Sequence, residues 1–362
     1  MIRVLMVGMH NKIGGIETFL INYYRHIDRE KVQFDFVNMF DQLCFQEEIC
    51  SFGGKIYSVP NVKRNPIGYY RALKKIIRDN NYKIVYVNML SAANILPITI
   101  SKILKVPNII AHAHNTGVPK GLLRKILDKL NKQTLRKSAT AFFASSKEAA
   151  EWMFGKDISY QLIYNAIEIE KFEYSEATRN DIRKKLGIEN DFVIGHVGRF
   201  CQQKNHSFLI EVFKSVSKKV KNAKLLLIGE GELKDSIIKK VKEYNLEKKV
   251  IFIDPVSNVN DYMQAMDVFV LPSIFEGLGI VLIEAQSAGL RCYAADNIPT
   301  VANVFKKITY LPLEEEQWIN AIEKEIENAG YNRVITKEEK RNCNYNIQEE
   351  AKKMQKYLES VI

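Results

Sequence analysis

The sequence of 362 residues lacks the features that mark secreted, membrane-spanning and metal-centred proteins. Its five cysteines are odd in number and form no C-x-x-C pair, so neither a disulfide framework nor a zinc site is indicated. The most apolar stretch, 95–111, contains two lysines and two prolines, so we expect no transmembrane helix. The first residues lead directly into a predicted strand, so we expect no signal peptide, and a reducing cytosol fits.

A complete dinucleotide fingerprint is also absent. The glycine-rich turn at 8–15 lacks the G-x-G-x-x-G spacing, and the G-E-G stretch at 229–231 has lysine where the third glycine belongs. His112 and His114 form an H-x-H pair, but no Asp, Glu or Cys lies nearby at metal-ligand spacing. Residues two apart in a strand point the same way, so one histidine could face a ligand while the other supports it. A purely structural histidine is the alternative.

Positive charge is concentrated in the first half of the chain. The net charge is +11, and residues 1–165 hold 24 Lys and Arg against 12 Asp and Glu, whereas residues 166–362 hold 29 against 30. This asymmetry predicts an anionic partner for the first half, such as anionic lipid, a phosphorylated acceptor or nucleic acid. We disfavour nucleic acid because no recognised binding module is present.

Short apolar strands alternate with helical patterns along the chain, which predicts parallel sheets covered on both faces. Strands are expected at Arg3–Val7, Gln33–Asn38, Ile84–Val87, Asn108–Ala113, Ala141–Ala144 and Tyr160–Ile163. After a junction they resume at Val193–His196, Lys224–Ile228, Val250–Ile253, Val268–Leu271 and Arg291–Ala294.

This alternation predicts two doubly wound α/β domains, 1–165 and 166–347, that face each other across a cleft. Ligands of such domains bind at the carboxyl ends of the strands. The segment 348–362 is an amphipathic helix, which could either cap the second domain or return to the first.

Two glutamates around a glycine-rich loop are the most informative feature. A buried strand ends near Pro272; Glu276 follows in a loop with Gly277 and Gly279, and Glu284 lies in the next helix. Free amides at a glycine-opened helix start suit a phosphate, and two carboxylates suit hydroxyl groups. The pattern therefore indicates a nucleotide sugar or a sugar phosphate, although an exposed loop acid and a solvated helix residue would look similar.

Three further segments carry candidate residues. Arg199 and Lys204 share a loop after the first strand of the second domain, where both could hold a phosphate. Adjacent Gly14 and Gly15 precede the first helix and would allow close backbone approach.

The third segment is the helical pattern at 121–137. It has a leucine-rich stripe and a basic face that includes Arg124, Lys125, Lys129 and Lys132. It fits either a core-facing helix or a helix at an anionic membrane surface.

Taken in order, these pieces resemble the retaining glycosyltransferases of family 4, which have the GT-B fold, and most of all bacterial enzymes of capsule and exopolysaccharide synthesis. The resemblance covers nearly the whole chain and includes an intact E-x₇-E motif, Glu276 to Glu284. Its other fragments are G-G-I-E-T (14–18), A-H-A-H-N (111–115), Y-N-A-I (164–167), G-H-V-G-R to K-N-H (195–206), L-I-G-E-G (227–231) and D-V-F-V-L-P-S (267–273).

The resemblance implies a role for each acid of the motif. Glu284 would bind the ribose hydroxyls of the donor. Glu276 would bind hydroxyls of the transferred sugar, helped by the amides of Gly277, Leu278 and Gly279.

It also implies how phosphate and acceptor are held. Arg199 and Lys204 would hold the diphosphate, and Gly14 with Gly15 would approach the distal phosphate. His114 would lie near the donor sugar and the acceptor. Since no D-x-D motif is evident and two cations are present, we expect no metal and no cofactor beyond the sugar donor.

The implied reaction is a retaining transfer from a nucleotide sugar, with a UDP-sugar expected, to a lipid-diphosphate-linked saccharide. It would occur in the cytoplasm, with peripheral contact at the inner face of the plasma membrane. Two alternatives remain: a nucleotide-sugar epimerase or sucrose-type synthase, and a non-catalytic nucleotide-sugar-binding protein. The second is prompted by the loop Leu290–Asn303, which departs from the family pattern.

Overall fold

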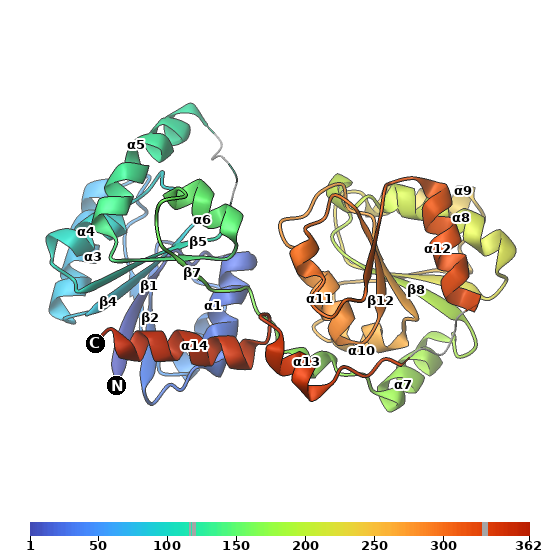
Figure 1. The fold of residues 1–362 in the computed structure, drawn as a ribbon. Coiled ribbons are helices and arrows are strands. Elements are labelled where there is room, and N and C mark those ends of the chain that lie inside the picture. Colours follow the sequence, from blue (N-terminus) through green and yellow to red (C-terminus); the bar gives the residue numbers. More distant parts are fainter. Residues whose placement is uncertain (116, 118–120, 328–331) are drawn as a thin grey trace. The chain divides into compact units, whose positions relative to one another are not determined.

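The computed structural model describes residues 1–115, 117, 121–327 and 332–362. The chain divides into two compact units (Figure 1). The first contains Met1–Ile167 together with Ile347–Ile362, and the second contains Glu168–Asn346. Each unit is built around one parallel sheet, and the boundary lies two residues after the predicted one.

The first unit has a seven-stranded sheet in the order β3-β2-β1-β4-β5-β6-β7, with every neighbouring pair parallel. Its strands are β1 (Ile2–Val7), β2 (Val32–Asn38), β3 (Ile56–Ser58), β4 (Ile84–Met89), β5 (Asn108–Ala113), β6 (Ala141–Ala144) and β7 (Gln161–Leu162). Its helices are α1 (Gly15–His26), α2 (Gln46–Ser51), α3 (Pro66–Asp79), α4 (Leu96–Ile103), α5 (Leu122–Ser138), α6 (Lys147–Phe154) and α14 (Ile347–Ser360).

Helices cover both faces of this sheet because alternate residues of its buried strands point to opposite sides. Val4 and Met6 of β1 pack in one apolar cluster with residues of α1 and α14. Leu5 and Val7 belong to a second cluster with residues of α3, α4 and α6. Helix α14 contacts α1 and crosses it (Figure 1), so the segment 347–360 completes the core of the first unit.

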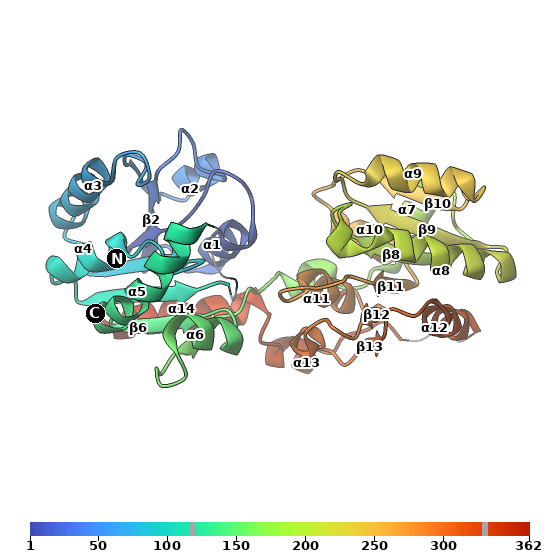
Figure 2. The ribbon, with the colours of Figure 1, turned by 90° about the horizontal axis from the view of Figure 1, so that it is seen from above.

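The second unit has a six-stranded parallel sheet in the order β10-β9-β8-β11-β12-β13, which Figure 2 shows in sequence. Its strands are β8 (Phe192–Val197), β9 (Ala223–Ile228), β10 (Val250–Ile253), β11 (Val268–Leu271), β12 (Arg291–Ala295) and β13 (Ile308–Leu311).

The α-helices of this unit are α7 (Glu176–Leu186), α8 (His206–Lys219), α9 (Lys234–Glu243), α10 (Val259–Ala265), α11 (Ile280–Ser287), α12 (Glu315–Glu327) and α13 (Lys337–Asn342). Short 3₁₀ turns are η1 (Ile169–Phe172), η2 (Gln202–Lys204) and η3 (Thr300–Ala302). Helix α7 contacts α10, and α12 contacts α8.

Each sheet reverses its strand order at one point, between β1 and β4 in the first unit and between β8 and β11 in the second. Loops leaving these adjacent strands at their carboxyl ends diverge and leave a crevice where ligands of such folds bind. The candidate residues of both units lie on or next to these loops.

Several elements are not predicted from the sequence, and α7 is an instructive example. Most of the residues of α7 are polar, so the helical periodicity of its apolar residues is weak. Its ends nevertheless carry clear signals: the Ser175 side chain caps Thr178, and Gly187 adopts a left-handed conformation after the last turn. The other missed elements are α2, β3, β13, α12 and α13. Within the described ranges, no helix is long and apolar enough to cross a membrane.

Candidate active site

Lys204 and Glu276 are in contact at the switch point of the second unit. Lys204 ends η2, on the loop after β8, and Glu276 lies on the loop after β11. Lys204 Nζ donates a hydrogen bond to Glu276 Oε1 at 2.7 Å, and the side chains are 17% and 9% exposed. Both residues were predicted from the sequence to belong to one site, and the structure brings them into contact.

Gln203 fixes the two loops against each other. Its carbonyl accepts a 2.8 Å hydrogen bond from the Ile274 amide, and its Nε2 donates to the Phe275 carbonyl at 2.9 Å. Sequence reasoning assigned no role to this residue. Because it clamps the backbone just before Glu276, it sets where that carboxylate meets Lys204.

Gly198 makes room for the lysine stem. A Cβ at this position would lie 3.1 Å from His196 Nε2 and 3.2 Å from Lys204 Cδ, closer than most real contacts. His196 is fully buried, and His206 packs 4.6 Å from it. Burial and the Lys204 charge lower the pKa of His206 to about 4, so its ring stays neutral beside the lysine.

Arg199 lies apart from this pair. Its guanidinium donates to Glu232 at 3.0 Å, and the two side chains are 71% and 57% exposed. The structure therefore does not bring Arg199 onto the Lys204–Glu276 pair. An ion pair this exposed is weak, so it leaves the arginine free to exchange partners with a ligand.

Glycines open the start of α11. Gly279 adopts φ 76° as the residue before the helix, and no side chain caps the first turn. Gly277 is exposed, and a Cβ there would touch nothing within 4 Å. The backbone from Gly277 to Gly279 thus approaches a helix start whose first amides have no side-chain partner, an arrangement suited to an anion or to hydroxyl oxygens.

Glu284 lies one turn into α11. Its carboxyl accepts no hydrogen bond from any residue that the structure describes. Burial raises its pKa to about 7, while the charges of Lys171 and Lys204 offset part of that shift. Lys204 therefore interacts with both acids: it donates a hydrogen bond to Glu276, and its charge favours the ionised form of Glu284. The carboxylate of Glu284 can still accept hydrogen bonds from hydroxyl groups of a ligand.

Gly14 and Gly15 lie at the switch point of the first unit. Gly14 precedes α1 in extended conformation without a side-chain cap, and Glu17 instead accepts a 2.9 Å hydrogen bond from the His10 amide. A Cβ on Gly15 would meet nothing within 4 Å. Internal packing therefore does not require glycine at 15, and the open space beside it is consistent with close approach by a ligand.

His114 follows β5 in the same unit, and its ring lies 3.9 Å from that of His112. His114 Nε2 is 2.8 Å from Asn88 Oδ1, while His112 Nδ1 is 2.8 Å from the Tyr86 hydroxyl. Burial lowers the pKa of His114 to about 3 and that of His112 well below its usual range, so both rings are neutral. The fully buried His112 supports the partly exposed His114.

Asn88 was missed by the sequence analysis. It is a polar side chain, 6% exposed, at the end of the otherwise apolar strand β4. A polar residue in a strand buried on both faces needs a partner, and that signal could have marked it. Among the described residues, no group of three or more His, Cys, Asp or Glu side chains could hold a metal ion.

Most of the apolar stripe of α5 does not face the core, although its fifth member, Leu127, is half-buried. Leu122, Leu123, Ile126 and Leu130 are 76%, 68%, 48% and 66% exposed. Arg124, Lys125 and Lys129 are also exposed.

Lys132 differs from these three cations. Its Nζ donates a hydrogen bond to the Trp152 carbonyl at 2.6 Å and lies 3.9 Å from the centroid of the Trp152 ring. Lys132 therefore belongs to the packing of α5 on α6, and only three of the four predicted cations face solvent.

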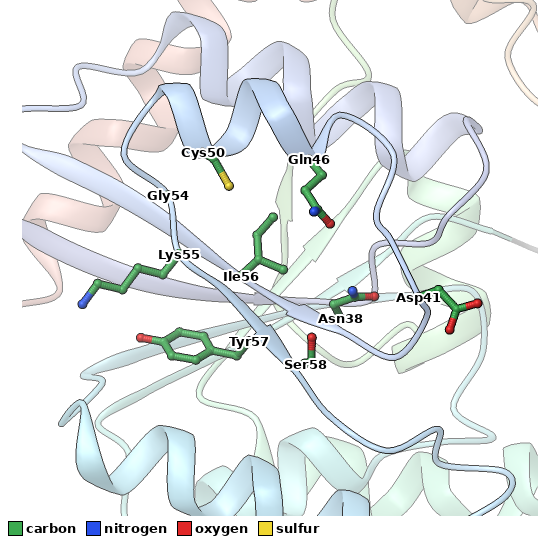
Figure 3. Close-up of a pocket in the computed structure, with 9 residues that line it drawn as sticks. All are labelled: Asn38, Asp41, Gln46, Cys50, Gly54, Lys55, Ile56, Tyr57 and Ser58. Atoms are coloured by element: carbon green, nitrogen blue, oxygen red, sulfur yellow. The ribbon is translucent and has the colours of Figure 1, made fainter.

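An open pocket of about 570 Å³ lies elsewhere in the first unit (Figure 3). It borders the edge strand β3, with the side chains of Gln46 and Cys50 from α2 above and Asn38 from β2 beside it. It contains none of the predicted site residues. We therefore assign the candidate site to the switch-point loops.

Comparison with known proteins identifies the family of the chain. Residues 13–171 match the family model described as Glycosyltransferase Family 4, and residues 178–350 match that of Glycosyl transferases group 1. The putative glycosyltransferase EpsF of Bacillus subtilis is 32% identical over 308 residues, which cover 82% of this chain and 79% of that protein.

An Escherichia coli enzyme, UDP-Gal:alpha-D-GlcNAc-diphosphoundecaprenol alpha-1,3-galactosyltransferase, is 26% identical over 265 residues, covering 69% of this chain and 68% of that protein. Among solved structures, a glycosyltransferase of Rickettsia africae has a TM-score of 0.79 at 15% identity, over 99% of this chain and 98% of that chain. HepE of Anabaena in complex with UDP has a TM-score of 0.72 at 19% identity, over 100% of this chain and 97% of that chain. The chain belongs to the glycosyltransferases of family 4 and has their GT-B fold.

Proposed function

We propose that this glycosyltransferase moves a sugar from a UDP-sugar to a lipid-diphosphate-linked saccharide during exopolysaccharide or capsule synthesis. The transfer retains anomeric configuration and needs no metal ion. The proposal depends above all on the contact of Lys204 with Glu276 beside the unsatisfied carboxyl of Glu284.

The geometry supports specific roles for these groups. A diphosphate leaving group gains negative charge as the glycosidic bond breaks. In this proposal Lys204 and the amides from Gly277 onward meet that charge, and such preorganised electrostatics is usually the largest catalytic contribution. Glu276 takes sugar hydroxyls and Glu284 takes ribose hydroxyls. The leaving phosphate accepts the proton of the attacking hydroxyl on the same face, so no separate base is required.

The choice of substrates is supported by relatives. The Escherichia coli enzyme is named for UDP-galactose as donor and for an undecaprenol diphosphate-linked acceptor. EpsF is the relative with the higher identity and coverage of the two. The name of the Escherichia coli enzyme supports a UDP-sugar donor and a lipid-linked acceptor for this chain, whereas that of EpsF specifies neither.

Contact with an anionic membrane surface is supported by α5. Its exposed leucines and isoleucine can enter the apolar boundary of a bilayer while Arg124, Lys125 and Lys129 meet anionic headgroups. A lipid-linked acceptor is embedded in such a surface, so this contact would bring the protein to its substrate.

The test is a transfer assay with a panel of UDP-, GDP- and dTDP-sugars and short undecaprenyl- or citronellyl-diphosphate saccharides, with EDTA present. We expect a lipid-linked product whose new linkage has the donor's anomeric configuration by NMR. An epimerised nucleotide sugar or a soluble disaccharide would favour the first alternative instead. Nucleotide-sugar binding without turnover would favour the non-catalytic one.

A further inference from the structure

Asn88 connects the end of β1 to His114 across the switch point of the first unit. Its Nδ2 donates to the Val7 carbonyl at 3.2 Å, and its Oδ1 lies 2.8 Å from His114 Nε2. The close approach depends on Gly8, which has φ 110° and whose Cβ would come within 2.4 Å of the Asn88 carbonyl oxygen. Close packing of the backbone at Gly8 and Asn88 therefore fixes the position of the Asn88 side-chain amide.

The orientation of the Asn88 amide follows from the chemistry of its neighbours. A backbone carbonyl only accepts hydrogen bonds, so the NH₂ group must face Val7 and the oxygen must face His114. An amide oxygen also only accepts, so His114 Nε2 must carry the hydrogen between them. Because the ring is neutral, Nδ1 is then unprotonated and presents a lone pair.

We propose that Asn88 is a positioning residue that holds His114 as the neutral Nε2–H tautomer, so that His114 Nδ1 accepts a hydrogen bond from a sugar hydroxyl of the substrate. The identity of that hydroxyl partner depends on the proposed function, whereas the tautomer is a property of the protein alone. Among the described residues, Nδ1 has no hydrogen-bond partner.

The fixed tautomer limits what His114 can recognise. A neutral ring with a lone pair at Nδ1 accepts a hydrogen bond from a hydroxyl, but it cannot donate one from that atom to a phosphate oxygen. Its ring is held by the nearby ring of His112 and by an edge contact with Phe19 at 5.0 Å. His114 therefore selects for a correctly placed hydroxyl group and does not carry charge to the diphosphate.

The first test reads the tautomer directly, in the full-length protein labelled with ¹⁵N-histidine. Two-bond ¹H–¹⁵N correlation spectra at pH 7 distinguish protonated from unprotonated ring nitrogens, and the His114 signals are those that vanish in His114→Gln. We expect a protonated Nε2 and an unprotonated Nδ1. A protonated Nδ1, or a mixture of both tautomers, in the wild-type protein would overturn the proposal without reference to enzymatic activity.

Two variants test the positioning role. Asn88→Ala should give mixed tautomers and lower kcat/KM by roughly tenfold, the equivalent of one hydrogen bond. Asn88→Asp keeps an acceptor for Nε2–H, so it should retain the tautomer, raise the pKa of His114 in the same spectra, and recover part of the lost activity.

A changed tautomer in Asn88→Ala with unchanged kcat/KM would refute the positioning role. If Asn88→Ala does not fold, the wild-type spectrum and the Asn88→Asp variant still decide the question. If the wild-type protein shows the expected tautomer but turns over no sugar donor, the proposed function fails while the tautomer assignment stands.

Discussion

Lys204 Nζ lies 2.7 Å from Glu276 Oε1, and this contact bridges the two loops that leave the second sheet at its switch point. A cation held by a carboxylate is oriented before a ligand arrives. In the proposed reaction, a donor diphosphate that enters between the loops would compete for the same ammonium group. The pair would then place the positive charge where the leaving group develops negative charge.

Replacing Lys204 should affect turnover far more than folding. We expect Lys204→Ala to lower kcat by about 10²–10³-fold, as removal of one preorganised electrostatic donor does in other enzymes. Steady-state kinetics and thermal unfolding measure the two effects. Lys239→Ala is a matched control, since this lysine is 80% exposed in the same unit. Equal kinetics for the two variants would contradict the role of Lys204.

Donor affinity should depend on the ionisation of Glu284. Its pKa is raised to about 7, so the carboxylate to which we assign the ribose hydroxyls is lost as pH falls below 7. We expect the affinity for UDP-glucose to fall toward tenfold per pH unit between 7 and 5, and Glu284→Gln to remove that dependence. The probe suits calorimetry because its diphosphate does not titrate in this range. A wild-type profile that is flat over these two units would contradict the assignment.

The same group predicts a stability effect of known sign. Because the folded-state pKa lies above the ordinary value of 4.5, protonated Glu284 contributes stability that is fully present below pH 4.5 and is lost as the pH rises through about 7. Glu284→Gln should therefore be more stable than wild type at pH 8 but not at pH 4.5. Urea unfolding at the two pH values measures this difference, and an equal offset at both would argue against a raised pKa.

Gly15→Ala should separate stability from activity. A Cβ there meets nothing within 4 Å, so the fold should be unchanged or up to ~1 kcal/mol more stable, because alanine suits a helix better than glycine. Activity should nevertheless fall at least about tenfold if a phosphate approaches that backbone. Gly8→Ala is the contrasting control, since its Cβ would clash with Asn88 and the protein should unfold more readily. A fully active Gly15→Ala protein would exclude close approach at this position.

Membrane binding should depend on both faces of α5. Serine at Leu122, Leu123, Ile126 and Leu130 should weaken binding to anionic vesicles by at least about hundredfold, because each buried side chain contributes about 1.5–3 kcal/mol. Serine at Arg124, Lys125 and Lys129 should remove only the preference for anionic over neutral vesicles, at about 1 kcal/mol per charge.

Liposome sedimentation measures both series. Ile67→Ser with Ile103→Ser is the control, since these residues are 63% and 59% exposed on other helices. The exposed positions should leave thermal stability unchanged in every variant. Sedimentation that is the same for all variants would refute a membrane role for α5.

Much of the fold was predictable because buried parallel strands are continuous apolar runs with helices between them. Strands β1, β4, β9 and β11 all appear at or within a few residues of their predicted positions. The missed elements are short or polar, such as β3 with three residues at the sheet edge, where burial imposes little pattern. Loop motifs placed Lys204 and Glu276 at strand ends, but only the sheet order, which reverses between β8 and β11, makes those strands neighbours.

Side-chain partners were less predictable. Arg199 and Lys204 are five residues apart on one loop, yet one pairs with exposed Glu232 and the other with Glu276. Lys132 looked like its basic neighbours on α5 but turns to Trp152. These outcomes depend on which group lies across the loop or helix in space, and residue type and spacing do not contain that information.

Helix α14 has a consequence for how the protein is made. The chain leaves the first unit at Ile167, builds the whole of Glu168–Asn346, and only then supplies Ile347, Ala351, Met354 and Leu358 to the core beside α1. During synthesis the earlier unit must wait on the ribosome with that apolar surface uncovered, while the later unit already has its complete set of residues. The first unit therefore cannot complete its fold until the second has left the ribosome. Until then its uncovered apolar surface is exposed to aggregation and to chaperone binding.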